Sequence, residues 1–337
     1  MSNKKLDILT VGRSSIDLYS QDIGSPFVQI QGFDAFVGGS PLNIAVGCAR
    51  LGLNASLLTG VGDDKVGDFI LNFLKNEKVN THAISTIPGS RSSAVVLGIE
   101  PPDKFPLVYY RDNAADSQIT IDDVIRAKVQ DYKILLINGT AMNMEPTRSA
   151  TFFAAEVGKK NNIDVVLDLD FRADQWHDYR AFGLTVRAVL SKVKIAIGTE
   201  EEILAATMNS TSQVTIKNQQ ISAPEIIGDI DSSIQALLKL GIETLIVKRG
   251  SKGASIFGAD GRVQDVPGFP VDIVNVLGAG DAFASGFLFG ILQGWDLYKS
   301  CRMGNASGAH VVTKKGCANF MPTLEESLKL INNRGGF

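Results

Sequence analysis

Strand-like and helical runs alternate through most of this 337-residue chain. The apolar runs typical of strands are 8–11, 56–59, 134–137, 165–168, 195–197 and 245–247. The amphipathic runs typical of helices lie near 41–51, 64–77, 146–160, 179–191, 200–207 and 231–240. Such an alternation predicts an α/β sandwich whose central sheet is largely parallel. Because ligands of these folds bind outside the carboxyl ends of the strands, the site is expected in the turns that follow them.

Two segments break this alternation, at about 16–37 and 91–113. They contain extended runs with no helix between them, and we expect these runs, 27–30 and 33–37 with 94–99 and 107–110, to pair as a small antiparallel sheet. The sheet has two interpretations, a lid over the substrate or an ordinary extension at the edge of the main sheet. A polar stretch at 209–220 is predicted to be a surface insertion.

Charge and cysteine content exclude several classes of function. The net charge of −3 provides no basic field for nucleic acid or for a membrane surface. The three cysteines have no metal-binding spacing, which favours reduced thiols in the cytoplasm. No leader or long apolar span is evident, so we predict a cytoplasmic protein without a membrane anchor.

A turn of small residues, Gly278, Ala279 and Gly280, precedes an apolar helix that begins near 282. The free backbone N–H groups at such a helix start, together with the helix dipole, form a site for an anion such as phosphate. Asp281 follows the turn directly. One interpretation is that its carboxylate takes a proton from a hydroxyl that attacks phosphorus. The other is that it only caps the helix; we favour the first, because a cap needs no Gly-Ala-Gly turn.

A second glycine turn, Gly38-Gly39, opens the helix near 41–51. Asn43 falls in the first turn of that helix, where its amide can bond the paired hydroxyls of a sugar. Asp17 follows the first strand and could accept hydrogen bonds from the same ligand. The alternative is that both side chains are structural, as Asn and Asp in turns usually are.

These two turns carry a resemblance to a known family. Gly38 and Gly39, with Asn43, Ala45, Gly52 and Gly62, resemble the first signature of the ribokinase-like (PfkB) carbohydrate kinases, and 275–281 resembles the second. The resemblance implies a three-layer sandwich formed by residues 1–337 as a single kinase domain, with 16–37 and 91–113 as a β-sheet lid. It implies transfer of the γ-phosphoryl group of ATP to a primary hydroxyl, with Mg²⁺. Asp281 would be the base, and Gly278, Ala279 and Gly280 the anion hole.

The same resemblance implies where the nucleotide and the metal bind. Lys248, Gly250 and Gly253 match the nucleotide loop, where the family usually has a smaller residue in place of Lys248. Asn305 matches the helix that borders adenine, although a position on the helix surface is the alternative. Glu202 matches the glutamate that orients Mg²⁺ through water.

The chain departs from the family in two places. Thr199 replaces the asparagine that accompanies the metal-orienting glutamate. Asn275 and Val276 replace an acidic residue and a threonine in a region that contributes to a monovalent-cation site. The need for K⁺ is therefore an open question.

Two arginines indicate the kind of substrate. Arg111 shares a face of the predicted lid strand with Tyr109, and Arg172 follows the strand at 165–168. An arginine that points into the pocket would recognise a carboxylate through two hydrogen bonds. A surface arginine at a sheet edge is the alternative for Arg111. The strings 33–39, 98–103 and 110–113 resemble the branch of the family that phosphorylates sugar acids.

The expected ligands are therefore a sugar acid and ATP, and a second copy of the chain docked through the lid is the candidate protein partner. Three other functions compete. The first is a kinase for a neutral sugar, with Arg111 facing solvent, and the second is a sugar sensor without catalysis, which Asp281 and the glycines disfavour. The third is an oxidoreductase that uses NAD, but the turn at 12–17 lacks the Gly-x-Gly-x-x-Gly pattern.

Overall fold

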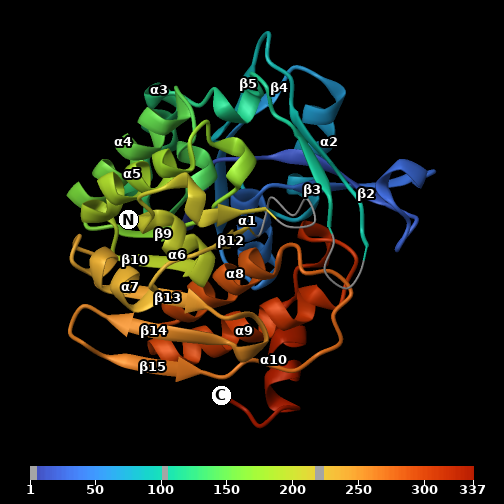
Figure 1. The fold of residues 1–337 in the computed structure, drawn as a ribbon. Helices are drawn as coiled ribbons and strands as arrows, with labels where there is room; N and C mark the ends of the chain where they lie inside the picture. Colours follow the sequence, from blue (N-terminus) through green and yellow to red (C-terminus); the bar gives the residue numbers. More distant parts are fainter. Residues whose placement is uncertain (1–5, 101–104, 217–223) are drawn as a thin grey trace.

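A computed structural model describes residues 6–100, 105–216 and 224–337, and it confirms the α/β class (Figure 1). Within these residues, nine strands form one sheet in the order β15-β14-β13-β10-β9-β8-β1-β4-β5. The strands are β1 Leu6–Val11, β4 Ala55–Gly62, β5 Ile84–Ile87, β8 Tyr132–Asn138, β9 Asp164–Asp168, β10 Ile195–Thr199, β13 Thr244–Lys248, β14 Ala254–Gly258 and β15 Val263–Val266. The strands from β13 to β5 are parallel, and β14 and β15 add an antiparallel edge.

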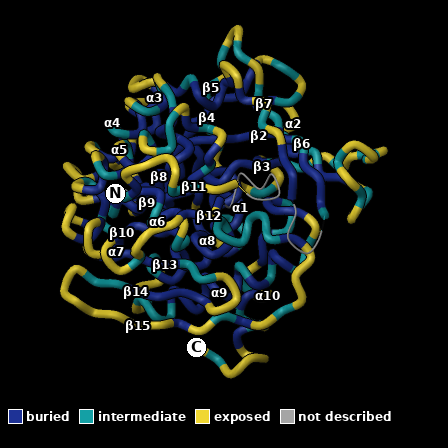
Figure 2. Tube along the Cα trace, in the orientation of Figure 1, coloured by how far each residue is buried: buried dark blue, intermediate teal, exposed yellow. Residues whose placement is uncertain are grey.

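Helices cover both faces of this sheet and give it three layers. One face carries α1 Ser40–Arg50, α2 Lys65–Asn76, α8 Ala279–Leu292, α9 Leu297–Val312 and α10 Leu324–Asn332. The other carries α3 Ile121–Ala127, α4 Thr147–Lys160, α5 Tyr179–Val189, α6 Glu200–Thr207 and α7 Ile230–Leu238. Because side chains alternate along a strand, neighbours such as Ile8 and Leu9 belong to different cores. Figure 2 shows the strands between these layers as the most buried part of the trace.

A separate sheet of four strands lies beside the sandwich, in the order β3-β2-β6-β7 (Figure 1). Its strands are β2 Ser15–Ser20, β3 Phe33–Gly38, β6 Ser93–Leu97 and β7 Leu107–Tyr110. The expectation of a purely antiparallel sheet is wrong, since β2 and β6 run parallel. The chain passes through α1, β4, α2 and β5 between these two strands, and a connection of that length allows the parallel direction. Phe27–Gln29 is a short 3-10 turn after Pro26, and not a strand.

Part of the polar stretch at 209–220 can be placed. A 3-10 turn, Thr211–Gln213, leads into β11 Val214–Thr215, which pairs with β12 Glu225–Ile226. Residues 217–220 lie outside the described residues, as do 101–103 of the string at 98–103. In the described part of the chain, none of the helices has both the length and the apolar character needed to cross a membrane.

Candidate active site

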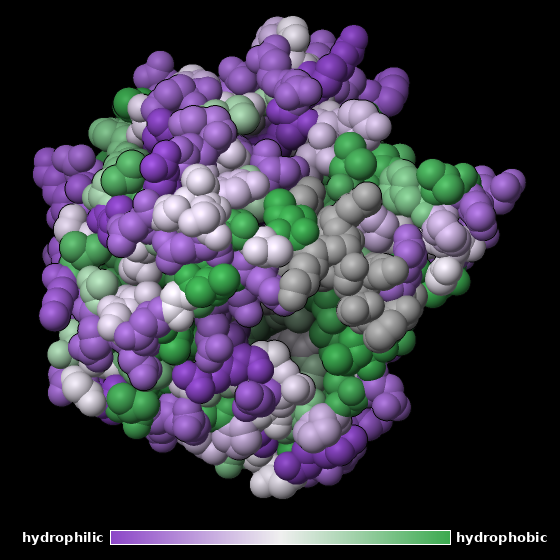
Figure 3. Space-filling model, viewed as in Figure 1, coloured by the Kyte–Doolittle hydropathy of each residue, from purple (hydrophilic) through white to green (hydrophobic). Residues whose placement is uncertain are grey.

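Two neighbouring cavities open at the carboxyl ends of the central strands. The large cleft, of about 510 Å³, is lined by residues that end or follow β9, β10 and β13. The small cavity, of about 60 Å³, lies between the small sheet, α1 and α8. Figure 3 shows the molecule from the same side as Figure 1, and this face has a hollow near its middle. Arg172, Leu277, Gly278 and Asp281 line both cavities, so Asp281 lies where they meet.

The backbone N–H groups at the start of α8 have no side-chain cap, although that of Ala279 donates to the carbonyl oxygen of Val276 at 3.3 Å. Gly278 is the N-cap, with a left-handed φ of 83°, and no side chain caps the helix. A Cβ at Gly278 would lie 2.1 Å from Sγ of Cys317, and one at Gly280 would lie 3.1 Å from Nζ of Lys248. The geometry of the turn therefore requires a glycine at 278, whereas at 280 the flexible Lys248 side chain would only have to shift slightly. The result is a bare helix N-terminus, flanked by Lys248, on the wall of the large cleft.

Asp281 is in the first turn of α8 and does not cap the helix. Its Oδ2 accepts a hydrogen bond of 2.7 Å from Nδ2 of Asn43. Burial, and then the charge of Asp170, raise the pKa of Asp281, while the Asn43 hydrogen bond, the nearby Ser40 hydroxyl and Arg172 lower it; the net shift is upward. A carboxylate with a raised pKa that still keeps a stabilising donor is a stronger base than an exposed one.

The first glycine turn positions two polar side chains at the small cavity. A Cβ at Gly38 would lie 1.9 Å from Oδ2 of Asp17, and one at Gly39 would lie 2.4 Å from the carbonyl oxygen of Arg13. Neither glycine is among the residues that line the small cavity, and their contact with substrate stays a prediction. Asp17 and Asn43 do line it. Oδ1 of Asn43 is buried and has no hydrogen-bond partner among the described residues, which leaves an acceptor for a ligand hydroxyl.

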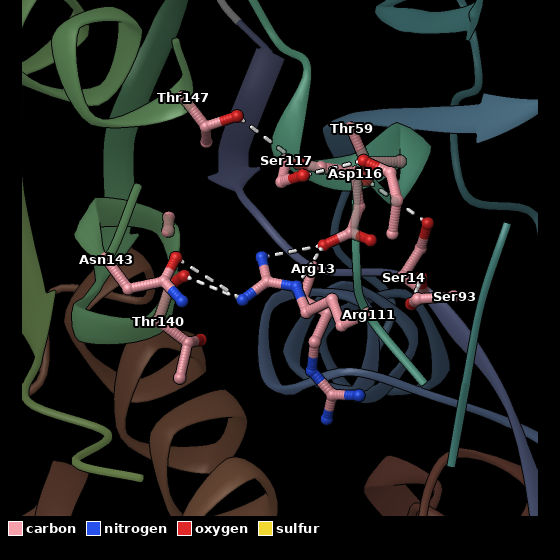
Figure 4. Close-up of polar contacts among 12 residues, drawn as sticks. Arg13, Ser14, Thr59, Ser93, Arg111, Asp116, Ser117, Thr140, Asn143 and Thr147 are labelled. Atoms are coloured by element: carbon pink, nitrogen blue, oxygen red, sulfur yellow. Dashed lines mark hydrogen bonds and ion pairs between the residues drawn. The ribbon is translucent and has the colours of Figure 1, made fainter. Parts of the chain in front are cut away.

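Arg111 does not point into either cavity, and this prediction of its orientation is wrong. Nε donates to Oδ2 of Asp116 at 2.8 Å, and Nη2 lies 2.7 Å from the same oxygen without the geometry of a second hydrogen bond (Figure 4). Nη1 donates to Oε1 of Gln175 and to the carbonyl oxygen of Thr140. Strand β7 ends at Tyr110, so strand alternation does not continue to Arg111. Its guanidinium instead joins the small sheet to the sandwich.

Two other arginines line the small cavity. Nη2 of Arg172 lies 2.7 Å from Oδ1 of Asp170, and Nη1 donates to the carbonyl oxygen of Phe171. Arg13 follows β1, and its guanidinium lies over the ring of Tyr109 at 5.1 Å from the centroid. Sequence reasoning missed Arg13, because a single arginine in a turn has no motif of its own. Its position directly after the central strand β1 was the available signal.

Lys248 ends β13 beside two acidic side chains in the large cleft. Nζ lies 3.3 Å from Oδ1 of Asp168 and 3.7 Å from Oε2 of Glu202. Burial lowers the pKa of Lys248, but the charges of Asp168 and Glu202 outweigh burial and the pKa rises. Burial raises the pKa of Asp168, and Glu202 adds to this rise while Lys248 opposes it. Lys248 is therefore a fixed cation close to the start of α8.

Glu202 and Thr199 form a capping box at the start of α6. Oε2 of Glu202 accepts from the backbone N of Thr199 at 2.8 Å, and Oγ1 of Thr199 accepts from the backbone N of Glu202 at 3.2 Å. In the ranges 6–100, 105–216 and 224–337, no group of three or more acidic, histidine or cysteine side chains could hold a metal ion by itself. One or two carboxylates at the cleft suit Mg²⁺, which usually keeps several waters and binds nucleotide phosphates.

Of three other residues matched to the family, one lines the large cleft and two have structural surroundings. Gly250 lines the large cleft, but Gly253 does not, and a Cβ there would lie 2.1 Å from the carbonyl oxygen of Val266. Asn305 is buried, and not on the helix surface; it donates to the carbonyl oxygens of Val266 and Pro267 and does not line the cleft. The structure therefore does not bring Gly253 and Asn305 to the cleft as predicted.

Asn275 is fully buried in the turn before α8. Nδ2 donates to the carbonyl oxygen of Lys315 at 3.2 Å, and Oδ1 accepts from the backbone N of Leu277 at 3.0 Å. These two bonds hold the turn in place, and Val276 lines the large cleft.

A family model described as pfkB family carbohydrate kinase matches residues 5–324. The chain is 33% identical to the 5-dehydro-2-deoxygluconokinase of Clostridium perfringens, over 96% of this chain and 91% of that protein. It is 31% identical to the protein of the same name from Geobacillus thermodenitrificans, over 98% and 94% respectively. Its fold resembles a putative ribokinase II from E. coli solved in complex with ATP and Mg²⁺, with a TM-score of 0.84 and 23% identity over 98% of this chain and 100% of that one. The chain therefore belongs to the PfkB family of carbohydrate kinases.

Proposed function

We propose that this kinase transfers the γ-phosphoryl group of ATP to the primary hydroxyl of a sugar acid, with 5-dehydro-2-deoxy-D-gluconate as its substrate. The observation that carries the proposal is the position of Asp281 at the junction of the two cavities. The large cleft has the size of a nucleotide site, and the small cavity has the polar lining of a sugar site. The choice of acid is supported by the names of the curated relatives and by Arg172.

Each group has a task in this mechanism. The N–H groups at the start of α8 and the Lys248 ammonium would hold the transferring phosphoryl group. Asn43 and Asp17 would bond the hydroxyls of the acceptor and orient it. Oδ of Asp281 would accept the proton of the primary hydroxyl as its oxygen attacks phosphorus.

Mg²⁺ would neutralise phosphate charge, with Glu202 and Asp168 facing it through water. Glu202 already bonds the start of α6 and lies near Lys248, so its carboxylate is held in place before ligands arrive. Lys248 would contribute a further positive charge beside these two carboxylates. This arrangement orients the phosphates without a cage of several protein ligands.

The small sheet would act as a lid. At about 60 Å³ the small cavity has room for roughly two water molecules, less than a six-carbon acid needs. Movement of the small sheet relative to α8 would enlarge the small cavity for the substrate. Exposed apolar side chains of the small sheet and of the loop between β2 and β3 would allow a second copy to dock there; they are Ile23, Val28, Phe33, Val108 and Tyr110. The use of ATP and three free cysteines support a cytoplasmic location.

A coupled assay for ADP release tests the proposed function. The panel contains 5-dehydro-2-deoxy-D-gluconate, 2-dehydro-3-deoxy-D-gluconate, D-fructose and D-ribose. We expect the largest kcat/KM with the first compound. A neutral sugar at the top of the ranking would refute the sugar-acid assignment, and binding without turnover of any compound would indicate a sensor.

A further inference from the structure

Arg13 is a buried cation that is linked to the carboxylate of Asp17 through the Ser15 hydroxyl and not by direct contact. Its side chain is only 9% exposed. Nη1 donates to Oγ of Ser15 at 2.9 Å, and among the described residues no carboxylate lies within ion-pair distance of the guanidinium. Arg111 and Arg172 are also largely buried, and each pairs with a buried aspartate. Asp17 attracts the Arg13 guanidinium without touching it, and a ligand carboxylate in direct contact would compensate the buried charge further.

The surroundings of Arg13 hold its guanidinium in place. The guanidinium lies over the ring of Tyr109, and its Nη1 donates to Oγ of Ser15. In Figure 4 the Arg13 guanidinium lies apart from the Arg111 network. Since Arg13 lines the small cavity, its unused N–H donors have a ligand site beside them. A guanidinium that is already held in place loses little conformational entropy when it binds a planar carboxylate.

Charges of both signs surround the small cavity, which Arg13, Asp17 and Asp281 line. Asp17 accepts from Ser15 at 2.6 Å, so a hydroxyl stands between Asp17 and Arg13. Asp281 lies at the junction with the large cleft. Both aspartates repel a carboxylate, whereas Arg13 attracts one. A sugar acid has its carboxylate and its primary hydroxyl at opposite ends, so this distribution favours one orientation, with the hydroxyl at Asp281.

We propose that Arg13 binds the carboxylate of the substrate and thereby selects sugar acids over neutral sugars. This inference rests on the proposed function. Arg172 contributes less to the selection, because its charge is already paired with Asp170. The ligand is thus a carboxylate with a primary hydroxyl at its far end.

Arg13→Gln tests this role with a pair of substrates that differ only in charge, 5-dehydro-2-deoxy-D-gluconate and its carboxamide. We expect kcat/KM for the acid to fall about 10- to 100-fold, chiefly through KM, because one charge-assisted contact is lost. The value for the carboxamide and the KM for ATP should change little. Arg13→Lys keeps the charge but not the planar fork, and should retain part of the preference for the acid.

Arg302→Gln is the matched control. Arg302 is also buried and lies over an aromatic ring, that of Phe269 at 4.0 Å, but it lines neither cavity. The acid-to-carboxamide ratio of kcat/KM in Arg302→Gln should equal that of the wild type. Should Arg13→Gln fail to fold, Arg13→Lys gives the answer through the same ratio.

The outcomes separate the two proposals. If the wild type prefers the acid and both Arg13 variants keep that preference unchanged, the role of Arg13 is overturned and the proposed function stands. Equal losses on acid and carboxamide would also overturn this role, since Arg13 would then support the cavity and not the carboxylate. A wild-type enzyme that prefers neutral sugars would overturn the proposed function and this inference together.

Discussion

Asn43 on α1 donates a hydrogen bond of 2.7 Å from Nδ2 to Oδ2 of Asp281 on α8, across 238 positions of sequence. The bond joins the two glycine turns in a single site. It stabilises the charged form of Asp281 in a buried setting, where desolvation acts in the opposite direction. The predictions below follow from this pair and from the residues that hold it.

Asn43→Ala should shift the acid limb of the pH profile of kcat to higher pH. The Asn43 hydrogen bond lowers the pKa of Asp281, so its removal lets that pKa rise further. Because the base works only when ionised, activity then appears at higher pH than in the wild type. The measurement is kcat against pH at saturating substrate. A limb that stays in place, or moves to lower pH, would show that this bond does not tune the base.

Gly278→Ala should destabilise the fold. The residue has φ of 83°, and a Cβ would lie 2.1 Å from Sγ of Cys317. We expect a loss of about 1–3 kcal/mol in the free energy of unfolding. Gly52→Ala is the control, since Gly52 has φ of 94° but nothing within 4 Å of its Cβ position, so it isolates the backbone strain. Equal losses in the two variants in denaturant titrations would mean that the contact with Cys317 relaxes freely.

Arg111→Met should lower stability without changing the preference for acids. The variant leaves Asp116, which is fully buried, without its cation. Breaking such a pair from one side typically costs about 3–5 kcal/mol. Denaturant titration measures the loss, and the acid-to-carboxamide ratio of kcat/KM reports selectivity. A large fall in the acid-to-carboxamide ratio with unchanged stability would show that Arg111 binds the substrate.

Because of Asn275, the activity of this kinase should depend less on K⁺ than that of family members with an acidic residue at this position. A neutral amide offers a cation less attraction than a carboxylate does, and its oxygen is already bonded to the backbone N of Leu277. We expect Na⁺ to replace K⁺ with less than about a tenfold loss in kcat/KM. Asn275→Asp should increase the difference between the two ions. Saturable activation by K⁺ and none by Na⁺ in the wild type would contradict this prediction.

The sequence predicted the parts of the protein that local pattern determines. The parallel strands, most of the helices and the turn before Asp281 follow from periodicity and from glycine placement. The surroundings of Arg111 and of Arg13 could not be predicted from this local pattern. Arg111 was assigned by extending strand alternation one residue too far, and its partner Asp116 has no recognisable motif. Arg13 lines the small cavity with its guanidinium over the ring of Tyr109, and these neighbours come together only in the folded chain. Such pairings depend on tertiary structure, which periodicity does not report.

The role of Asp281 as the base is tested most directly by the turnover of Asp281→Asn with ATP and 5-dehydro-2-deoxy-D-gluconate. The amide keeps the shape of the side chain but cannot take the proton of the primary hydroxyl. We expect kcat to fall by about 10²–10⁴-fold, with circular dichroism and ATP affinity close to those of the wild type. Turnover near the wild-type value in a correctly folded variant would show that the carboxylate at the junction of the two cavities is not the base.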